Sequence, residues 1–249
     1  MAELMRVSSG VPGLDAMLGG GYIPQSAILV RGAPGTGKTT FGLQFVLDGA
    51  RQGQAGLFVT FEEFPQSLYR DAASLGWNLA EAEASGALHL LFTSPEVLLT
   101  SLAAPDSNLL RRIQQGDIRR VVVDSLTHFT RAVRDDHARR RAYHQVISAF
   151  RREGVTAVYL DEEGRADYTR QERGGLSFIV DTLIMLRYLE IDSAIQRALL
   201  VLKMRGSAHD TTIHRYTIGS GGSAVGEPLT GLSGLLSGLV ERHLISTVQ

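Results

Sequence analysis

The chain has 249 residues, of which 44% are hydrophobic and 20% are charged, a composition typical of a globular protein that can bury a sizeable core. Its formal net charge of −1 gives no electrostatic reason to expect binding to nucleic acid or to a membrane surface. The absence of cysteine excludes disulfides and thiolate chemistry. The N-terminus lacks a long apolar segment and no run of about 18 apolar residues follows, so we expect a cytoplasmic protein without a membrane span.

Apolar strand-like runs alternate with helix-like segments up to about residue 163. Glycine-punctuated residues 7–25 come first and leave room for one short helix near 14–18. The expected strands lie at 26–31, 56–61, 87–92, 119–125 and 155–160. The expected helices lie at 39–51, 65–75, 95–104, 107–115 and after Asp135-Asp136, which can cap the last of them. Because the strands are apolar on both faces, the alternation predicts an α/β fold with a parallel sheet covered by helices.

The pattern changes in the last third of the chain. Residues 164–175 are polar and are typical of a long loop. Three strand-like runs follow with little helix between them, which predicts antiparallel pairing at one edge of the sheet; they lie at 178–189, 197–204 and 212–218. Gly219-Ser220-Gly221-Gly222-Ser223 is typical of a flexible linker. The apolar residues after it suggest a short amphipathic tail helix, and they are Leu232, Leu235, Leu236, Leu239 and Val240. We therefore predict one α/β domain over residues 1–218 and a linker with a tail over 219–249.

Residues 32–39 match the pattern Gly-x-x-x-x-Gly-Lys-Ser/Thr at every position, between a strand-like run and a helix-like segment. In such a loop the backbone N–H groups and the N-terminus of the following helix favour bound phosphate. Lys38 would reach the β- and γ-phosphates, and the Thr39 hydroxyl would ligate Mg²⁺. The pattern predicts a nucleoside triphosphate site formed by Gly35, Thr36, Gly37, Lys38, Thr39 and Thr40.

Hydrolysis also needs a carboxylate that holds or orders Mg²⁺ and a group that orients the attacking water. Asp124 ends the apolar run 121–123, and ligands of open parallel sheets bind beyond the carboxyl ends of the strands, so we expect Asp124 at the metal; a helix-capping acid is the alternative. Glu62 and Glu63 also follow a strand, and adjacent side chains of an extended chain point apart. We favour Glu62 as the one that faces the phosphates and the metal, with Glu63 as its support; a solvated acidic turn is the alternative.

Five segments together resemble the KaiC-type ATPases, a branch of the RecA-like P-loop fold: residues 9–15, 32–40, 60–63, 123–127 and 203–210. The resemblance covers nearly the whole chain, and the final third looks most like the second ATPase repeat of the circadian clock protein of this family. It implies a RecA-like domain that hydrolyses ATP with Mg²⁺. It also implies a ring of identical subunits, typically a hexamer, with ATP at each subunit interface.

The resemblance further implies roles for individual residues. The positions of Glu62 and Glu63 are the catalytic glutamates of the family, and Lys203 and Arg205 match a lysine and an arginine finger that reach the γ-phosphate of the neighbouring subunit. Alternate side chains of a strand share a face, which agrees with paired cations, although the charged face of an edge strand is the alternative. Further positions match residues near the nucleotide in the family, namely Ser74, Leu75, Met204, Ser207 and His209.

The chain departs from the clock protein at several points. It has one ATPase repeat instead of two, and the Ser-Thr phosphorylation pair corresponds to Ser177-Phe178. A two-site phosphorylation cycle is therefore not expected, while autophosphorylation at Ser177 is a hypothesis beside that of an ordinary loop hydroxyl. Asp161 stands where RecA-like proteins often place a neutral polar residue that senses the γ-phosphate. Phosphate would repel an acid there unless the acid bound a metal or a proton, so the role of Asp161 is left open.

Three functional hypotheses follow. The first is an ATP-hydrolysing ring that couples nucleotide state to conformation or to an unidentified protein partner. The second is a DNA-binding recombinase or helicase relative, because arginines lie at 131, 134, 139–141, 165, 170 and 173, in or near segments that line the DNA channel of recombinases. Acids interleave with these arginines and the chain begins almost at the ATPase motif, so nucleic acid is not expected. The third is an ATP-bound scaffold with negligible turnover. The histidines show no metal-binding spacing.

Overall fold

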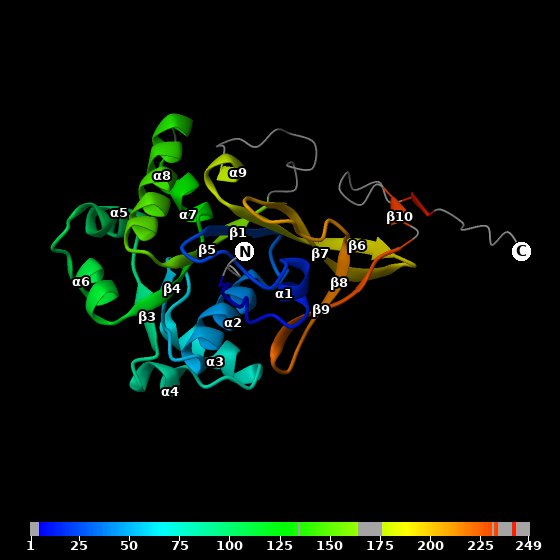
Figure 1. Ribbon diagram of the computed structural model, residues 1–249, viewed down its shortest axis with the longest axis horizontal. Coiled ribbons are helices and arrows are strands. Elements are labelled where there is room, and N and C mark those ends of the chain that lie inside the picture. The colour runs from blue at the N-terminus through cyan, green and yellow to red at the C-terminus, as the bar shows by residue number, and fades with distance from the viewer. Residues whose placement is uncertain (1–4, 134, 164–175, 231, 234–240, 243–249) are drawn as a thin grey trace, which may run out of the picture.

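The computed structural model describes residues 5–133, 135–163, 176–230, 232–233 and 241–242. One sheet of nine strands runs through the molecule in the order β3-β2-β4-β5-β1-β6-β7-β8-β9, with helices on both of its faces (Figure 1). A separate antiparallel pair is formed by β10 (Leu232–Ser233) and β11 (Glu241–Arg242). Among the described helices, none combines the length and apolarity that a membrane span requires.

Six parallel strands form the larger part of the sheet, and they are β1 (Ala27–Gly32), β2 (Ala55–Thr60), β3 (Leu88–Phe92), β4 (Ile118–Asp124), β5 (Thr156–Glu162) and β6 (Thr182–Ile191). Residues 28–30, 57–59 and 121–123 are buried on both faces, as β-branched and leucine-rich runs between two helical layers should be. The predicted parallel α/β sheet is confirmed. Because β5 lies between β1 and β4, the carboxyl ends of β1 and β4 are separated by the width of one strand.

The helices divide between the two faces, and each face has its own apolar cluster. The first face is covered by α1 (Leu14–Met17), α2 (Lys38–Arg51), α3 (Pro65–Ser74) and α4 (Leu79–Ala84). The second face is covered by α5 (Pro95–Ala103), α6 (Asn108–Gln115), α7 (Thr127–Ala132), α8 (Asp136–Arg152) and α9 (Leu176–Ile179). Asp135 caps α8, as predicted, because its carboxylate accepts from the N–H groups of His137 and Ala138.

The C-terminal strands β7 (Ala194–Met204), β8 (His214–Gly219) and β9 (Gly222–Pro228) continue the sheet from β6 in antiparallel pairing, which confirms the predicted antiparallel edge. The linker prediction is wrong. Residues 219–223 form the turn and the beginning of the second strand of the β8–β9 hairpin, and β9 extends the sheet past the predicted boundary at 218. Gly221 and Gly222 have φ angles of 92° and 98°, so glycine here serves a tight turn.

Two further expectations meet the structure only in part. Residues 178 and 179, predicted as strand, belong to the short helix α9, and β6 begins at Thr182. In the predicted tail helix, Leu232 lies in β10, and the other four apolar residues lie outside the described residues. The polar segment 164–175 lies outside them as well.

A fully buried arginine ties the N-terminal segment to the sheet and to α2. Arg120 of β4 is 0% exposed, and its guanidinium lies 4.9 Å from the centre of the Phe45 ring. A Cβ at Gly49 would come within 2.5 Å of its Cδ, so α2 carries a glycine where the arginine passes. The guanidinium donates to Asp48 Oδ2 (3.0 Å), Gln54 Oε1 (2.9 Å), Gln52 Oε1 (3.2 Å) and the carbonyl oxygens of Phe45 (2.9 Å) and Ser8 (3.0 Å).

Replacing Arg120 with methionine should destabilise the fold strongly, because the Asp48 carboxylate and two carbonyl oxygens lose their donor. We expect Arg120→Met to lower the free energy of unfolding by about 3 kcal/mol in urea denaturation. The adjacent Arg119 is 56% exposed, and among the described residues it is paired with Asp117 alone. Arg119→Met is therefore the matched control and should change the free energy of unfolding by about 0.5 kcal/mol or less. Equal losses in the two variants would contradict the role assigned to Arg120.

Candidate functional site

The phosphate loop leaves the end of β1 and enters α2. Gly35 and Gly37 have φ angles of 78° and 89°, which favour glycine, and Gly37 is the N-cap residue of α2. The Thr36 hydroxyl donates to the carbonyl oxygen of Ala33 at 2.8 Å and so holds the loop from within. Lys38, Thr39 and Thr40 form the first turn of the helix, which brings all six predicted phosphate-binding residues to the carboxyl edge of the sheet.

The two predicted metal ligands of this edge lie in contact. Thr39 Oγ1 donates to Asp124 Oδ2 at 2.7 Å, which joins the first turn of α2 to the end of β4. Burial raises the pKa of Asp124, and the hydrogen bond from Thr39 and the charge of Lys38 oppose that rise. A hydroxyl and a carboxylate are the oxygen ligands that Mg²⁺ takes alongside phosphate and water. One hydroxyl and one carboxylate fit Mg²⁺ that is bound together with a phosphate, and within the described ranges no group of three acidic, histidine or cysteine side chains is arranged to hold a metal.

The Lys38 ammonium folds back over its own loop. It donates to the carbonyl oxygens of Gly32 at 2.8 Å and Ala33 at 3.0 Å. Burial lowers the pKa of Lys38, while the carboxylates of Glu162, Asp124 and Asp161 act in the opposite direction. A cation held between the loop and these acids is placed to exchange carbonyl contacts for phosphate oxygens.

The two glutamates after β2 differ in their surroundings. The Glu62 side chain is 68% exposed, and its carboxylate lies 3.1 Å from His128 Nε2. Glu63 is half-buried, and burial raises its pKa together with the nearby carboxylates of Asp124, Asp71 and Glu62. Its N–H donates to Thr60 Oγ1 at 3.2 Å, which closes the turn after the strand. The site therefore offers two carboxylates of different character, and His128 is a neighbour that sequence reasoning missed.

Asp161, whose role the sequence left open, is compensated within the chain. Its Oδ2 lies 2.9 Å from Arg31 Nη2, and its Oδ1 accepts from the Thr127 hydroxyl at 3.2 Å. Burial raises its pKa, and Arg31 opposes that rise. The same Thr127 oxygen accepts from the N–H of Glu162 at 2.8 Å. Asp161 thus links β1 and β5 to the segment after Asp124, without a metal or a phosphate to balance its charge.

The β8–β9 hairpin packs against the outside of the phosphate loop, a contact that sequence reasoning missed. The Tyr216 hydroxyl donates to the carbonyl oxygen of Thr36, and the Tyr216 side chain is buried. A Cβ at Gly37 would come within 2.3 Å of Ile218 Cδ1, and one at Gly35 within 2.9 Å of the Tyr188 hydroxyl. A side chain at either loop glycine would therefore displace the end of a neighbouring side chain, and the backbone angles also favour glycine.

The helix that follows the phosphate loop also holds the hairpin. Gln44 of α2 accepts from the N–H of Ser223 at 2.7 Å and donates to its carbonyl oxygen at 2.9 Å. The N–H of Gly221 donates to the carbonyl oxygen of Leu75 at 2.8 Å. The predicted nucleotide contacts Ser74 and Leu75, at the end of α3, therefore lie beside the hairpin that covers the loop.

The remaining predicted site residues form a second group at the opposite end of the sheet. Lys203 pairs with Leu183, which lies beside Leu29 in β1, three residues before the loop begins. Three residues along a strand and two strand spacings across the sheet each amount to about 10 Å. Because β7 is antiparallel to β6, the chain moves still farther from the loop at Arg205. The two predicted finger residues thus lie away from the phosphate loop of their own chain.

Both cations of this second group hold α9. Lys203 donates to the carbonyl oxygens of Ser177 and Val180, and Arg205 donates to that of Phe178 at 2.8 Å. These carbonyls belong to the end of a short helix, where backbone oxygens lack helical partners. Ser177, the hypothetical phosphorylation site, is partly buried on α9.

Three further predicted nucleotide contacts lie at the end of β7 or just after it. Met204 points the other way from the cations and is buried in the core. The Ser207 hydroxyl accepts from Arg6 at 2.8 Å, and the Nε2 atom of His209 is buried without a hydrogen-bond partner among the described residues. The structure therefore splits the predicted site into two sets of residues. The phosphate-loop group consists of residues 35–40, Asp124, Glu62 and Glu63, and the finger group contains Lys203 and Arg205.

Comparison with known proteins finds relatives that match nearly the whole chain. A family model described as "ATPase: KaiC" matches residues 7–230. The chain is 35% identical over 245 residues to the circadian clock oscillator protein KaiC of Picosynechococcus sp., and 35% identical over 245 residues to KaiC 1 of Synechocystis sp.. Each alignment covers 94% of this chain, and the chain spans about 45% of the length of these relatives. The crystal structure of a KaiC-like protein from the hyperthermophilic archaeon Pyrococcus horikoshii is similar with a TM-score of 0.80 and 28% identity, covering 90% of this chain and 100% of that one.

Removing the Tyr216 hydroxyl should weaken nucleotide binding, because the Thr36 carbonyl loses the donor that positions the loop. We expect Tyr216→Phe to raise the Kd for ATP about fivefold in isothermal titration calorimetry. Tyr159 is the matched control, since its hydroxyl is buried without a partner among the described residues. Tyr159→Phe should leave the Kd unchanged, and a similar rise in both variants would count against a specific role of Tyr216.

Proposed function

The chain belongs to the KaiC ATPase family. From this we propose that it binds and hydrolyses ATP in a ring of identical subunits, in which the neighbouring subunit completes each ATP site. The observation that carries the proposal is the separation of the phosphate-loop group from the finger group across the sheet. In a ring joined head to tail, opposite sides of one subunit meet at every interface, so the phosphate loop of one subunit and the finger residues of the next would lie at one nucleotide.

Within one subunit, the residues of the phosphate-loop group would bind the triphosphate and neutralise its charge. Residues 35–40 would receive the triphosphate on backbone N–H groups and on the end of α2. Lys38 would leave its carbonyl partners for the β- and γ-phosphates, and Thr39 and Asp124 would hold Mg²⁺, with Glu62 beside it. When bound, Mg²⁺ neutralises charge that develops on the phosphate oxygens.

The glutamates after β2 supply the group that orients water. Glu63 is half-buried with a raised pKa, which suits a proton acceptor, while Glu62 is exposed and held by His128. We assign water activation to this pair, and the pairing with His128 fixes the Glu62 carboxylate beside the strand end.

The finger group couples nucleotide to conformation. On a neighbouring γ-phosphate, Lys203 and Arg205 would make charge-assisted contacts that are stronger than their bonds to the neutral carbonyls of α9. Engagement therefore releases α9 from two of its donors. Conformational output and any protein partner would be sensed at this helix.

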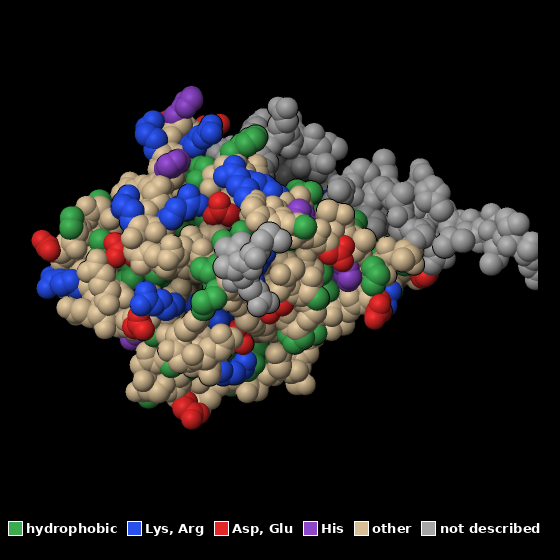
Figure 2. Space-filling model, in the orientation of Figure 1, with side chains coloured by type: hydrophobic (Ala, Val, Ile, Leu, Met, Phe, Trp, Pro, Cys, Tyr) green, Lys and Arg blue, Asp and Glu red, His purple; other side chains and the backbone are tan. Residues whose placement is uncertain are grey.

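The charge on the face drawn in Figure 2 does not favour the DNA-binding alternative. On the face drawn in Figure 2, the Lys and Arg side chains of the described residues lie in separate patches with Asp and Glu between them. A phosphate backbone is instead tracked by a continuous basic stripe.

Removing both glutamate charges should abolish turnover and leave binding intact. For Glu62→Gln together with Glu63→Gln, we expect hydrolysis to fall about 100-fold or more while the Kd for ATP changes little, because the carboxylates act on water. Phosphate release and calorimetry measure the two quantities. Glu81→Gln on exposed α4 is the control with full activity. Unchanged hydrolysis in the double variant would overturn the assignment.

Mixing two kinds of inactive subunit tests whether the neighbouring subunit completes the ATP site. Arg205→Ala and Lys38→Ala should each be inactive alone, with the loss of an arginine finger costing about 1000-fold. Mixed rings should regain part of the turnover, because some interfaces then combine an intact phosphate loop with intact fingers. Arg205→Ala mixed with Lys203→Ala is the control without recovery, since every interface then lacks one finger. Native mass spectrometry with ATP establishes mixed assembly, and no recovery within proven mixed rings would sink the proposal.

A further inference from the structure

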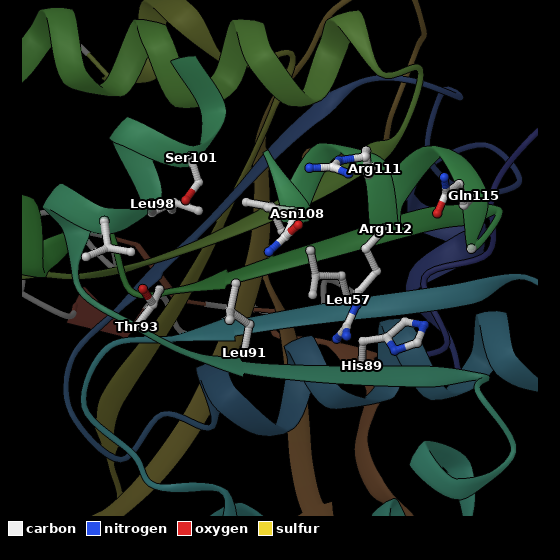
Figure 3. Close-up of a pocket in the computed structure, with 13 residues that line it drawn as sticks. Leu57, His89, Leu91, Thr93, Leu98, Ser101, Asn108, Arg111, Arg112 and Gln115 are labelled. Atoms are coloured by element: carbon white, nitrogen blue, oxygen red, sulfur yellow. The ribbon is translucent and has the colours of Figure 1, made fainter. Parts of the chain in front are cut away.

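A pocket of about 710 Å³ opens near the β3 edge of the sheet, on the face that α5 and α6 cover (Figure 3). Its floor is formed by Leu57 of β2 and by His89 and Leu91 of β3, and its walls come from α5 and α6. Strands β2, β4 and β5 separate β3 from β1, a distance of about 19 Å across the sheet. The pocket also lies on the opposite face from α2 and is therefore separate from the phosphate loop.

The α6 wall of the pocket is polar and basic. Asn108, Arg111, Arg112 and Gln115 are spaced i, i+3, i+4 and i+7, so they share one face of the helix, and all four line the pocket. The described residues that line it include two arginines and one histidine and no aspartate or glutamate. The pocket is therefore positively charged in a chain whose formal net charge is −1.

The two arginines differ in what they can offer a ligand. Arg111 is held at the rim, where Nε and Nη2 donate to the carbonyl oxygen of Asp106 at 3.0 and 2.7 Å. The Arg112 side chain makes no ion pair or hydrogen bond with any residue in the described part of the chain. In Figure 3 its guanidinium reaches down from α6 toward the His89 ring, and burial and the charge of Arg112 lower the pKa of His89. The guanidinium and the imidazole thus present N–H donors to the same space.

Apart from the hydroxyl side chains of Thr93 and Ser101, the other side chains that line the pocket are apolar. Leu57, Leu91 and Leu98 face the pocket, and Val97 at its mouth is 56% exposed. A volume in this range holds a small organic molecule, and apolar walls with a few convergent polar groups are typical of such sites.

We propose that this pocket binds a small molecule that joins an apolar body to one anionic group, a carboxylate or a phosphate ester. The apolar body lies against Leu57, Leu91 and Leu98, and the anionic group accepts from Arg112 and His89. The site is independent of ATP, because it lies on the other face of the sheet and at the far edge from β1.

Fluorescence titration with anilinonaphthalene sulfonate tests the proposal, because this probe has an aromatic body and a single sulfonate. We expect saturable binding to the intact chain that ATP does not displace, and Arg112→Met should weaken it about tenfold by removing the charge while keeping an apolar stem. Arg51→Gln, at the exposed end of α2 on the opposite face, is the matched control without effect. Equal affinity in the wild type and Arg112→Met overturns the proposal, as does displacement by ATP.

Competition identifies the anion. Octanoate, octyl phosphate and octanol are tested as competitors of the bound probe. Stronger displacement by octanoate or by octyl phosphate than by octanol supports the site and identifies the carboxylate or the phosphate as its preferred group. Equal displacement by octanol overturns it, because the pocket would then select only an apolar chain. Thermal melting of Arg112→Met should match the wild type, since the side chain has no partner to lose among the described residues.

Discussion

The direction of the six parallel strands is the constraint on which the site depends. Every carboxyl end of β1 to β6 opens at one edge, so the phosphate loop after β1, the glutamates after β2 and Asp124 at the end of β4 converge without any need for sequence proximity. The same direction sends the antiparallel strand β7 toward the other edge, where Lys203 and Arg205 emerge. One structural rule thus brings the predicted residues of the phosphate loop and its acids together, and it puts the two predicted finger residues at the other end of the sheet.

Buried charges hold this arrangement in place at three points. Arg120 joins the N-terminal segment, α2 and β4 beneath the helix that bears the loop. Asp161 and Arg31 join β5 to β1 at the loop itself. Arg187 and Glu163 form a third pair, with side chains 9% and 6% exposed, between β6 and the end of β5. Each pair links elements that are distant in sequence, and breaking one would leave an uncompensated charge in the interior, so the pairs favour one register over others.

Sequence reasoning reached the local parts of the site and missed the contacts made over long distances. Short runs of consecutive residues were enough to predict the phosphate loop, the position of Asp124 at a strand end and the parallel strands, and all of them lie where the pattern predicted. The partner of Asp161 lies 130 residues away and the partner of Tyr216 lies 180 residues away, and no spacing rule reports such pairs. The linker error has another cause. Glycine and serine suit both a flexible linker and a tight hairpin turn, and only the strand β9 that follows distinguishes the two.

The contacts of the finger group with α9 explain how a ring of this kind would respond to ATP and not merely contain it. Lys203 and Arg205 are already satisfied by carbonyl oxygens, so they gain by moving only when a stronger acceptor is presented. A γ-phosphate is such an acceptor, because its negative charge adds a Coulombic attraction to the two cations that a neutral carbonyl does not offer. Hydrolysis removes that acceptor, and the carbonyls of α9 then compete again. Differential contact in two states is the condition for any ligand to shift a conformational equilibrium, and in the proposed function α9 is the element whose contacts would change between them.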